Sequence, residues 1–252
     1  MRAGLAFVVI YFAFDRLAAV LGSTRGEAGL VVCAAIVTLA LLAERWLTHA
    51  PLRSCLVALG LGAPATRALL AAVALSAALL ACLPLLAAMT GAELALRAGA
   101  AWLALGMLAQ GGIAEEVLFR GFMYRHLRRT RTFWRAATLS AVPFTAAHVP
   151  LLWTLDPTVA LLALAMAIAW SFPLAWLFDR ACGSIWPGAI MHAVMQGAIK
   201  LLVDDGAAFQ SLAIAWVALG IGTPWLFFLL REREPGSGAV SEPVAASTPR
   251  RP

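Results

Sequence analysis

Two adjacent carboxylates, Glu115 and Glu116, follow a long apolar stretch that is almost free of charge. An ionisable residue near the centre of a bilayer costs about 2.5–3.5 kcal/mol on insertion scales, so such residues usually serve a function. Glu116 and Arg120 have the i,i+4 spacing at which a carboxylate and a guanidinium pair best on a helix. Glu115 points about 100° away from that face. We therefore predict that Glu116 is the structural partner of Arg120 and that Glu115 is free to act on a water or a substrate.

Two histidines occupy similar positions in other apolar stretches. His148 follows Phe144 by four residues, and His192 precedes Gln196 by four, so each pair shares a helix face. The ring of Phe144 would pack beside the imidazole. Counted at 1.5 Å per residue from Arg125, Ser184 and Arg135 at the expected cytoplasmic edge, Glu115, His192 and His148 lie roughly 15, 12 and 20 Å deep. We expect these three side chains to meet in the cytoplasmic half of a membrane.

These groups are suited to hydrolysis of an amide bond by water. Glu115 would accept a proton from a water that His148 also holds, and the hydroxide would attack the carbonyl carbon. His192 and Gln196 would donate hydrogen bonds to the developing oxyanion. No serine or cysteine lies beside a suitably spaced histidine at this depth, so we expect water rather than a side chain to be the nucleophile.

The composition indicates an integral membrane protein. Of the 252 residues, 62% are hydrophobic and 13% are charged, whereas soluble domains have roughly 45–50% and 25%. The net charge of +6 comes almost entirely from arginine, with Lys200 the only lysine. These charges gather in short loops, which argues against a nucleic-acid-binding surface. The four cysteines are scattered without a CxxC pair, which argues against a disulfide framework or a zinc knuckle.

The apolar segments predict an all-α polytopic bundle with a buried polar site. A membrane span needs about 20 mostly apolar residues. Eight segments meet that need: 3–22, 28–47, 67–90, 98–120, 134–152, 157–178, 184–203 and 207–230. Asp15 and Arg16 interrupt the first, and we expect them to face the bundle or to snorkel to the interface. Residues 1–231 would form one helical domain, and 232–252, rich in Pro, Gly, Ser and charge, a disordered cytoplasmic tail.

The distribution of arginine predicts the orientation in the membrane. Loops on one side and the tail carry most of the arginines: Arg45, Arg53, Arg67, Arg125, Arg128, Arg129, Arg131, Arg135, Arg231, Arg233, Arg250 and Arg251. The other side holds Arg25 and Arg97, with Lys200 at the edge of a span. Because cytoplasmic loops carry an excess of Lys and Arg, both termini are expected in the cytoplasm.

Three motifs in this order resemble those of the CAAX-protease and bacteriocin-processing (CPBP, or ABI) family of intramembrane proteases, which includes the type II CAAX prenyl endopeptidases. The motifs are Glu-Glu-x-x-x-Arg at Glu115, Glu116 and Arg120, Phe-x-x-x-His at Phe144 and His148, and His-x-x-x-(Asn/Asp) at His192. The resemblance covers about residues 100–200. The third motif departs from the pattern because Gln196 replaces Asn or Asp, which moves the amide by about 1.5 Å.

The resemblance implies a glutamate-dependent endopeptidase that cleaves a membrane-associated or lipidated protein near the cytoplasmic side of, we expect, a bacterial inner membrane. Glu115 and His148 would activate water, and the His192 motif would form the oxyanion hole. No cofactor is expected. A zinc site at Glu115, His148 and His192 stays open, although the sequence has no HExxH.

Two other functions compete with the protease. Gln196 keeps open a catalytically weak relative that binds a membrane partner, for example in bacteriocin immunity. A small transporter or proton-coupled channel could use the same acids, but we find no internal repeat of the kind that many transporters show. The substrate stays open among prenylated CAAX proteins, bacteriocin precursors and sorting-signal proteins, as does the oligomeric state.

Overall fold

The computed structural model describes residues 2–21, 25–154, 156–203 and 206–230. The expected tail at 232–252 lies outside this part of the chain. Throughout the described ranges the elements are helices, and the only extended pairing there is an isolated bridge between Leu96 and Leu202.

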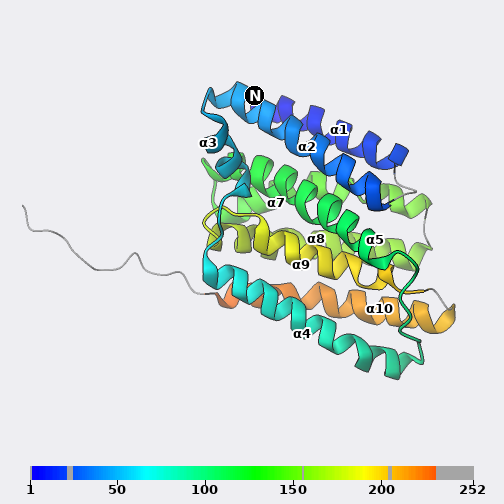
Figure 1. The fold of residues 1–252 in the computed structure, drawn as a ribbon. Coiled ribbons are helices and arrows are strands. Elements are labelled where there is room, and N and C mark those ends of the chain that lie inside the picture. Colours follow the sequence, from blue (N-terminus) through cyan, green and yellow to red (C-terminus); the bar gives the residue numbers. More distant parts are fainter. Residues whose placement is uncertain (1, 22–24, 155, 204–205, 231–252) are drawn as a thin grey trace, which may run out of the picture.

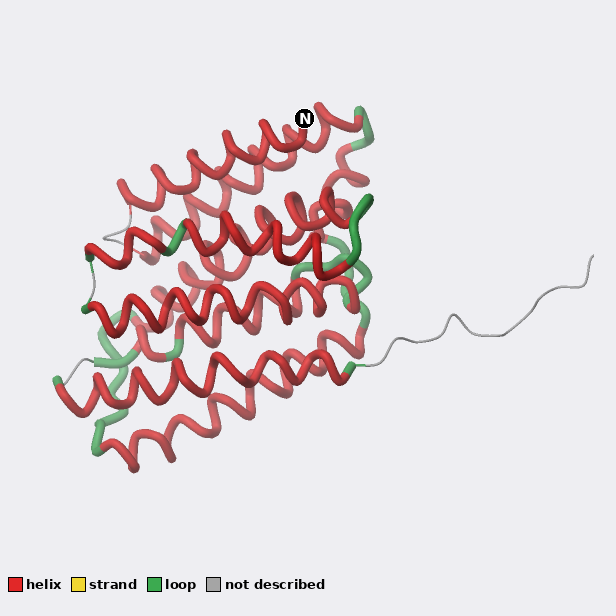
Figure 2. Tube along the Cα trace, turned by 180° about the vertical axis from the view of Figure 1, so that it is seen from behind, coloured by secondary structure: helices red, strands yellow, loops and turns green. Residues whose placement is uncertain are grey.

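Six helices among the described residues are long and apolar enough to cross a membrane. They are α1 (Arg2–Leu21), α2 (Arg25–Thr48), α4 (Thr66–Thr90), α7 (Phe133–Ala146) with the 3₁₀ turn η4 (Val149–Trp153), α8 (Pro157–Arg180), and α10 (Ala207–Gly222) with the 3₁₀ segment η6 (Thr223–Leu229). They lie side by side in one bundle (Figures 1 and 2). The chain is thus an all-α integral membrane protein, which confirms the fold predicted from its composition.

The two remaining predicted spans, 98–120 and 184–203, are helical but irregular. The first begins as α5 (Ala100–Met107), continues through the π-helical segments η2 (Leu108–Ala114) and η3 (Val117–Tyr124), and ends as α6 (Arg125–Arg128). The second is the short α9 (Trp186–Gly197), extended by the 3₁₀ turn η5 (Ile199–Leu201). These two segments carry both glutamates and His192. Because π-helical turns occur often at functional sites, the irregularity falls where the sequence predicts the chemistry.

The packing places the irregular helices inside the bundle. The segment η2 contacts both α2 and α9, and α9 also packs against α4. On the far side of η3, α7 and α8 complete the enclosure, while α10 lies against α8 and α4. The core beside η3 is aromatic, with Phe119, Phe122 and Phe144 all buried. A second core around Trp170, Met191 and Trp216 supports α9 from the other side.

A short helical segment, Leu52–Leu61, fixes the start of α9. It consists of α3 (Leu52–Leu56) and the π-helical η1 (Val57–Leu61). Gly60 adopts a positive φ of 85°, which favours glycine, and its carbonyl accepts a hydrogen bond from the Ile185 amide at 2.9 Å. The Ser184 hydroxyl donates to the Gly62 carbonyl, also at 2.9 Å. The first turn of α9 is therefore tied to α3–η1 rather than left as a free helix end.

The two ends of the described chain lie at the same end of the bundle (Figure 1). The basic residues in the last turns of α2, α6 and α8 are at that end as well: Arg45, Arg125, His126, Arg128 and Arg180. We call this end of the bundle the arginine-rich end.

Candidate active site

A line of buried polar side chains connects η3 to α9. Nη1 of Arg120 lies 3.0 Å from Oε1 of Glu116, and the same oxygen lies 2.9 Å from Nδ1 of His192. All three residues are at most 2% exposed. An isolated charge at either position would be strongly unfavourable. The ion pair of Glu116 and Arg120 therefore compensates two charges that the apolar core could not hold separately.

The imidazole of His192 also faces the second carboxylate. Its Nε2 lies 3.6 Å from Oε2 of Glu115. That oxygen is buried and has no hydrogen-bond partner among the described residues. His192 is thus flanked by two neighbouring glutamates, one on each ring nitrogen. The edge-to-face rings of Trp170 at 5.4 Å and Phe144 at 6.1 Å enclose its faces.

Hydrogen bonding sets the roles of the ring nitrogens of His192. The carboxylate of Glu116 can only accept, so Nδ1 of His192 donates to it. In the neutral ring Nε2 is then an acceptor directed at Glu115, and in the charged ring it is a donor. Glu116 therefore orients the ring of His192, as a carboxylate orients histidine in a catalytic triad.

The second histidine lies at the end of α7. Nδ1 of His148 donates to the Phe144 carbonyl at 2.8 Å, because a carbonyl oxygen can only accept. In the neutral ring this leaves Nε2 as an acceptor. The Phe144 ring contacts His148 at 5.0 Å between centroids, and Cζ of Arg120 lies 4.5 Å from the centre of the same ring. Phe144 thus packs between the ion pair and the imidazole.

A cavity of about 250 Å³ opens beside these groups. Its lining residues come from seven helical elements, α1, α5, η2, η3, η4, α9 and η5, and from three residues between elements: Tyr11, Phe14, Asp15, Ala18, Gly106, Met107, Gln110, Gly111, Glu115, Phe119, Ala147, His148, Leu151, Gln196 and Lys200. Of the predicted site residues, the cavity brings together Glu115, His148 and Gln196. The others, Glu116, Arg120, Phe144 and His192, lie behind this wall. The sequence placed His192 and Gln196 together as oxyanion donors, whereas only Gln196 reaches the cavity.

The position of Gln196 depends on a glycine. A Cβ added at Gly111 would overlap Oε1 of Gln196, so the carboxamide lies directly on the backbone of η2. At Gly188 an added Cβ would come 3.1 Å from Oε2 of Glu116. Since neither position carries a side chain, α9 approaches the glutamate-bearing helix closely. The longer side chain of Gln196, compared with Asn or Asp, finds its space at Gly111.

Sequence analysis missed Gln110 as a lining residue. In a regular α-helix, residues five apart lie on different faces, so Gln110 and Glu115 were not considered together. The i→i+5 hydrogen bonding of a π-helix widens the turn, and both side chains line the cavity. The consecutive glycines at 111 and 112, which weaken a regular helix, were the signal in the sequence that could have suggested such an irregularity.

The residues left open for a zinc site are not grouped as metal ligands in the described part of the chain. Among the described residues, no three His, Cys, Asp or Glu side chains are grouped so as to bind an ion, and this includes Glu115, His148 and His192. We therefore assign no step to a metal.

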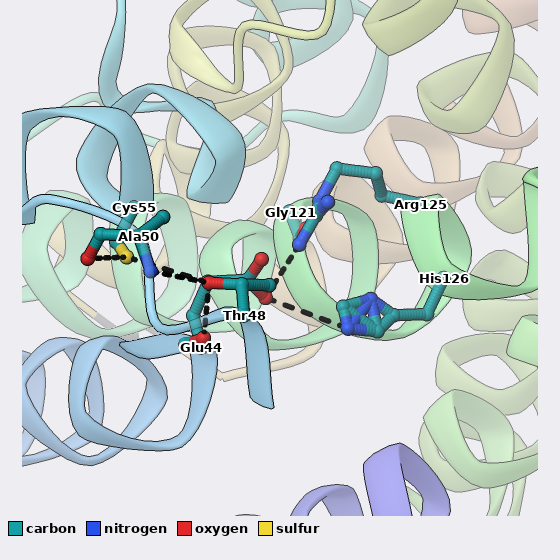
Figure 3. A network of polar contacts seen from close by, with 7 residues as sticks. All are labelled: Glu44, Thr48, Ala50, Cys55, Gly121, Arg125 and His126. Atoms are coloured by element: carbon teal, nitrogen blue, oxygen red, sulfur yellow. Dashed lines mark hydrogen bonds and ion pairs between the residues drawn. The ribbon is translucent and has the colours of Figure 1, made fainter. Parts of the chain in front are cut away.

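A second buried polar cluster anchors the glutamate-bearing helix to α2. Oε2 of Glu44, a residue only 1% exposed, lies 2.6 Å from Nη2 of Arg125 and 3.4 Å from Nε2 of His126 (Figure 3). Burial, together with the charges of Arg125 and Arg129, lowers the pKa of His126 to about 4. Phe122 stacks on its ring at 4.9 Å. Arg125 already balances Glu44, so His126 remains neutral near pH 7.

The fold and this site define a polytopic helical membrane protein with a carboxylate–histidine centre inside the bilayer. Residues 97–198 match the family model described as Type II CAAX prenyl endopeptidase Rce1-like. This stretch thus resembles an Rce1-like domain of the CPBP family, the family that the three motifs predicted. No curated protein matches the sequence. The matched range includes all seven predicted site residues, while α1, which lines part of the cavity, precedes it.

Proposed function

We propose that the protein is an intramembrane endopeptidase that hydrolyses a peptide bond in a membrane-associated or lipidated protein. The observation that carries this proposal is the shared cavity of Glu115 and His148, with an unpartnered oxygen on the glutamate. Proteins of the Rce1-like family are generally glutamate proteases that work without a metal. We further propose that the protein resides in a bacterial inner membrane with both termini in the cytoplasm.

In the proposed reaction Glu115 is the general base. A water held between Glu115 and Nε2 of His148 loses a proton to Glu115, and its oxygen forms a bond to the carbonyl carbon of the substrate. The carboxamides of Gln196 and Gln110 face the same cavity and can donate to the oxyanion. Glu115 then returns its proton to the amide nitrogen as the C–N bond breaks. The products are a carboxylate and an amine.

The buried residues behind the cavity support this base. When Glu115 gains a proton, its negative charge disappears beside His192. The pair of Glu116 and Arg120 keeps the imidazole in place through that change. These two residues thus act through His192 rather than on the substrate, and we assign them positioning roles.

The direct test uses the purified protein in detergent with membrane-anchored peptides, and mass spectrometry to detect new termini. In H₂¹⁸O, one labelled oxygen should enter the new carboxylate. Glu115→Gln and His148→Ala should each lower the rate by about 10²–10⁴-fold, the usual contribution of a general base. The matched control is Glu27→Gln, an exposed carboxylate on α2. Full activity in both site variants would refute the assignment.

A second function calls for its own experiment because Gln196 departs from the family pattern. If the protein acts by binding a membrane partner, as an immunity protein would, Glu115→Gln should still rescue a strain that lacks the gene. Rescue by the wild type alone would instead support hydrolysis.

A further inference from the structure

The cavity lies on one side of the site, away from the arginine-rich end. Along the helix that begins with α5, its lining runs from Gly106 to Phe119 and stops before Arg125. In α1, which starts at the arginine-rich end, the lining residues from Tyr11 to Ala18 belong to the second half. Both helices thus line the cavity with residues that lie toward the end of the bundle opposite the arginine-rich end.

The other segments that line the cavity also lie toward the end opposite the arginine-rich end. The residues Ala147, His148 and Leu151 come after the last turn of α7, whose first turn is next to the arginines of the preceding loop. On α9 the lining begins at Gln196 and continues to Lys200 in η5, while the start of α9 is tied to Gly60. Lys200 lies eight residues beyond His192, roughly 12 Å further along the helix axis.

The outer part of the cavity carries charged groups. Asp15 of α1 and Lys200 of η5 both line it. The side chain of Asp15 is 38% exposed, and its neighbour Arg16, 78% exposed, lies 3.6 Å away. Ionisable residues inside membrane proteins face water-filled spaces or one another. An aqueous mouth explains why an otherwise apolar span contains an aspartate.

The described residues at the arginine-rich end contribute nothing to this cavity. None of its lining residues comes from α3, η1, α6 or the first turn of α9. That end is filled by the contacts of Glu44 with Arg125 and His126, and by the hydrogen bonds from Ser184 and Ile185 to Gly62 and Gly60 at the end of the α3–η1 segment.

We infer that the catalytic cavity opens on the extracytoplasmic face of the membrane and receives its peptide from there. The positive-inside rule assigns the arginine-rich end to the cytoplasm, so Asp15 and Lys200 stand at the opposite face. The inference rests on the proposed function for what happens to the peptide once bound. It defines the substrate class as membrane-anchored proteins whose cleavable segment lies outside the cytoplasm, in place of the cleavage near the cytoplasmic side that the sequence suggested.

Cysteine labelling in intact spheroplasts tests this inference without any need for a substrate. The probe is a charged maleimide that does not cross the membrane. In a Cys182→Ser background, Ala18→Cys and Leu151→Cys each place a thiol in the cavity lining. Ile168→Cys, exposed in the middle of α8 where lipid surrounds the helix, is the matched control. The wild-type Cys182 is exposed and follows α8 at the arginine-rich end.

We expect both cavity cysteines to be labelled in intact spheroplasts at close to their level after permeabilisation. Cys182 should react at least tenfold more after permeabilisation, and Ile168→Cys should react in neither state. Labelling of Cys182 but not of the cavity cysteines in intact spheroplasts would overturn the inference, and so would cavity cysteines that never react. Because labelling requires no catalysis, an inactive protein with the expected pattern would refute the proposed hydrolysis and leave the direction of access supported.

Discussion

Nη1 of Arg120 lies 3.0 Å from Oε1 of Glu116, and both side chains are enclosed by the bundle. Removing one member of a buried pair leaves the other charge uncompensated, at a cost of roughly 3–5 kcal/mol. Arg120→Met should therefore lower the midpoint of thermal unfolding in detergent markedly. Arg53→Met, at an exposed arginine on α3, should leave it nearly unchanged.

A double substitution separates charge from packing at this position. Replacing a buried ion pair by apolar residues of similar size is often neutral or stabilising. The variant Arg120→Met with Glu116→Leu should hence recover much of the lost stability, yet remain inactive because His192 has lost its orienting carboxylate. Equal destabilisation by the single and double variants would contradict this account.

Gly111 and Gln196 should behave as a coupled pair. Gly111→Ala introduces a Cβ into the space occupied by Oε1 of Gln196, so it should lower peptidase activity by displacing the carboxamide. The shorter Asn at 196 withdraws that oxygen. Gln196→Asn in the Gly111→Ala background should restore part of the activity, which a double-mutant cycle on kcat/KM measures. Additive effects of the two substitutions would show that they do not interact.

Gln110 offers a test of the π-helical geometry. Its carboxamide lines the cavity near Glu115, and loss of one oxyanion donor typically lowers kcat by about 10²–10³-fold. Gln110→Leu should reduce kcat in that direction with little change in thermal stability. The control is Gln210→Leu, at an exposed glutamine of α10. Unchanged kcat in Gln110→Leu would exclude this residue from the reaction.

Acid should weaken the contact between α2 and α6. The pKa of His126 falls from its ordinary value of 6.5 to about 4 in the folded protein. Between these values the unfolded chain binds a proton that the folded chain does not, so stability decreases as pH falls from 6.5 to 4. The loss approaches roughly 3 kcal/mol below pH 4. His126→Phe, measured by thermal unfolding across this range, should flatten the pH dependence, whereas an identical slope in the variant would contradict the assignment.

The sequence was sufficient for the membrane class and for the residues of the three motifs. Apolar runs of the required length are a direct consequence of bilayer thickness, so α1, α2, α4, α7, α8 and α10 were readable from composition. The i,i+4 spacing of Glu116 and Arg120 likewise predicted the ion pair that the structure contains.

Other parts of the site depend on tertiary geometry that spacing does not encode. The sequence could not place His192 between the two glutamates, because that contact joins residues 76 positions apart along the chain. Nor could it reveal that Asp15 and Lys200 share a cavity with Glu115, since α1 and η5 meet the central helix only after folding. The role of Gln110 was hidden because a 3.6-residue period was assumed through a segment that is π-helical.

The π-helical turns of η2 also constrain how this chain can vary in length. Deleting one residue between Gln110 and Glu115 would let the segment relax into an ordinary α-helix, which is locally the more favourable backbone. The side chains downstream would keep nearly their present directions, because a π-helical turn accommodates one extra residue, whereas the same deletion in the regular helix α5 would rotate the acidic pair by about 100° away from its partners. The site thus depends on a helix that contains an extra residue. The neighbouring helices α2 and α9, which pack against η2, hold this wider turn in place.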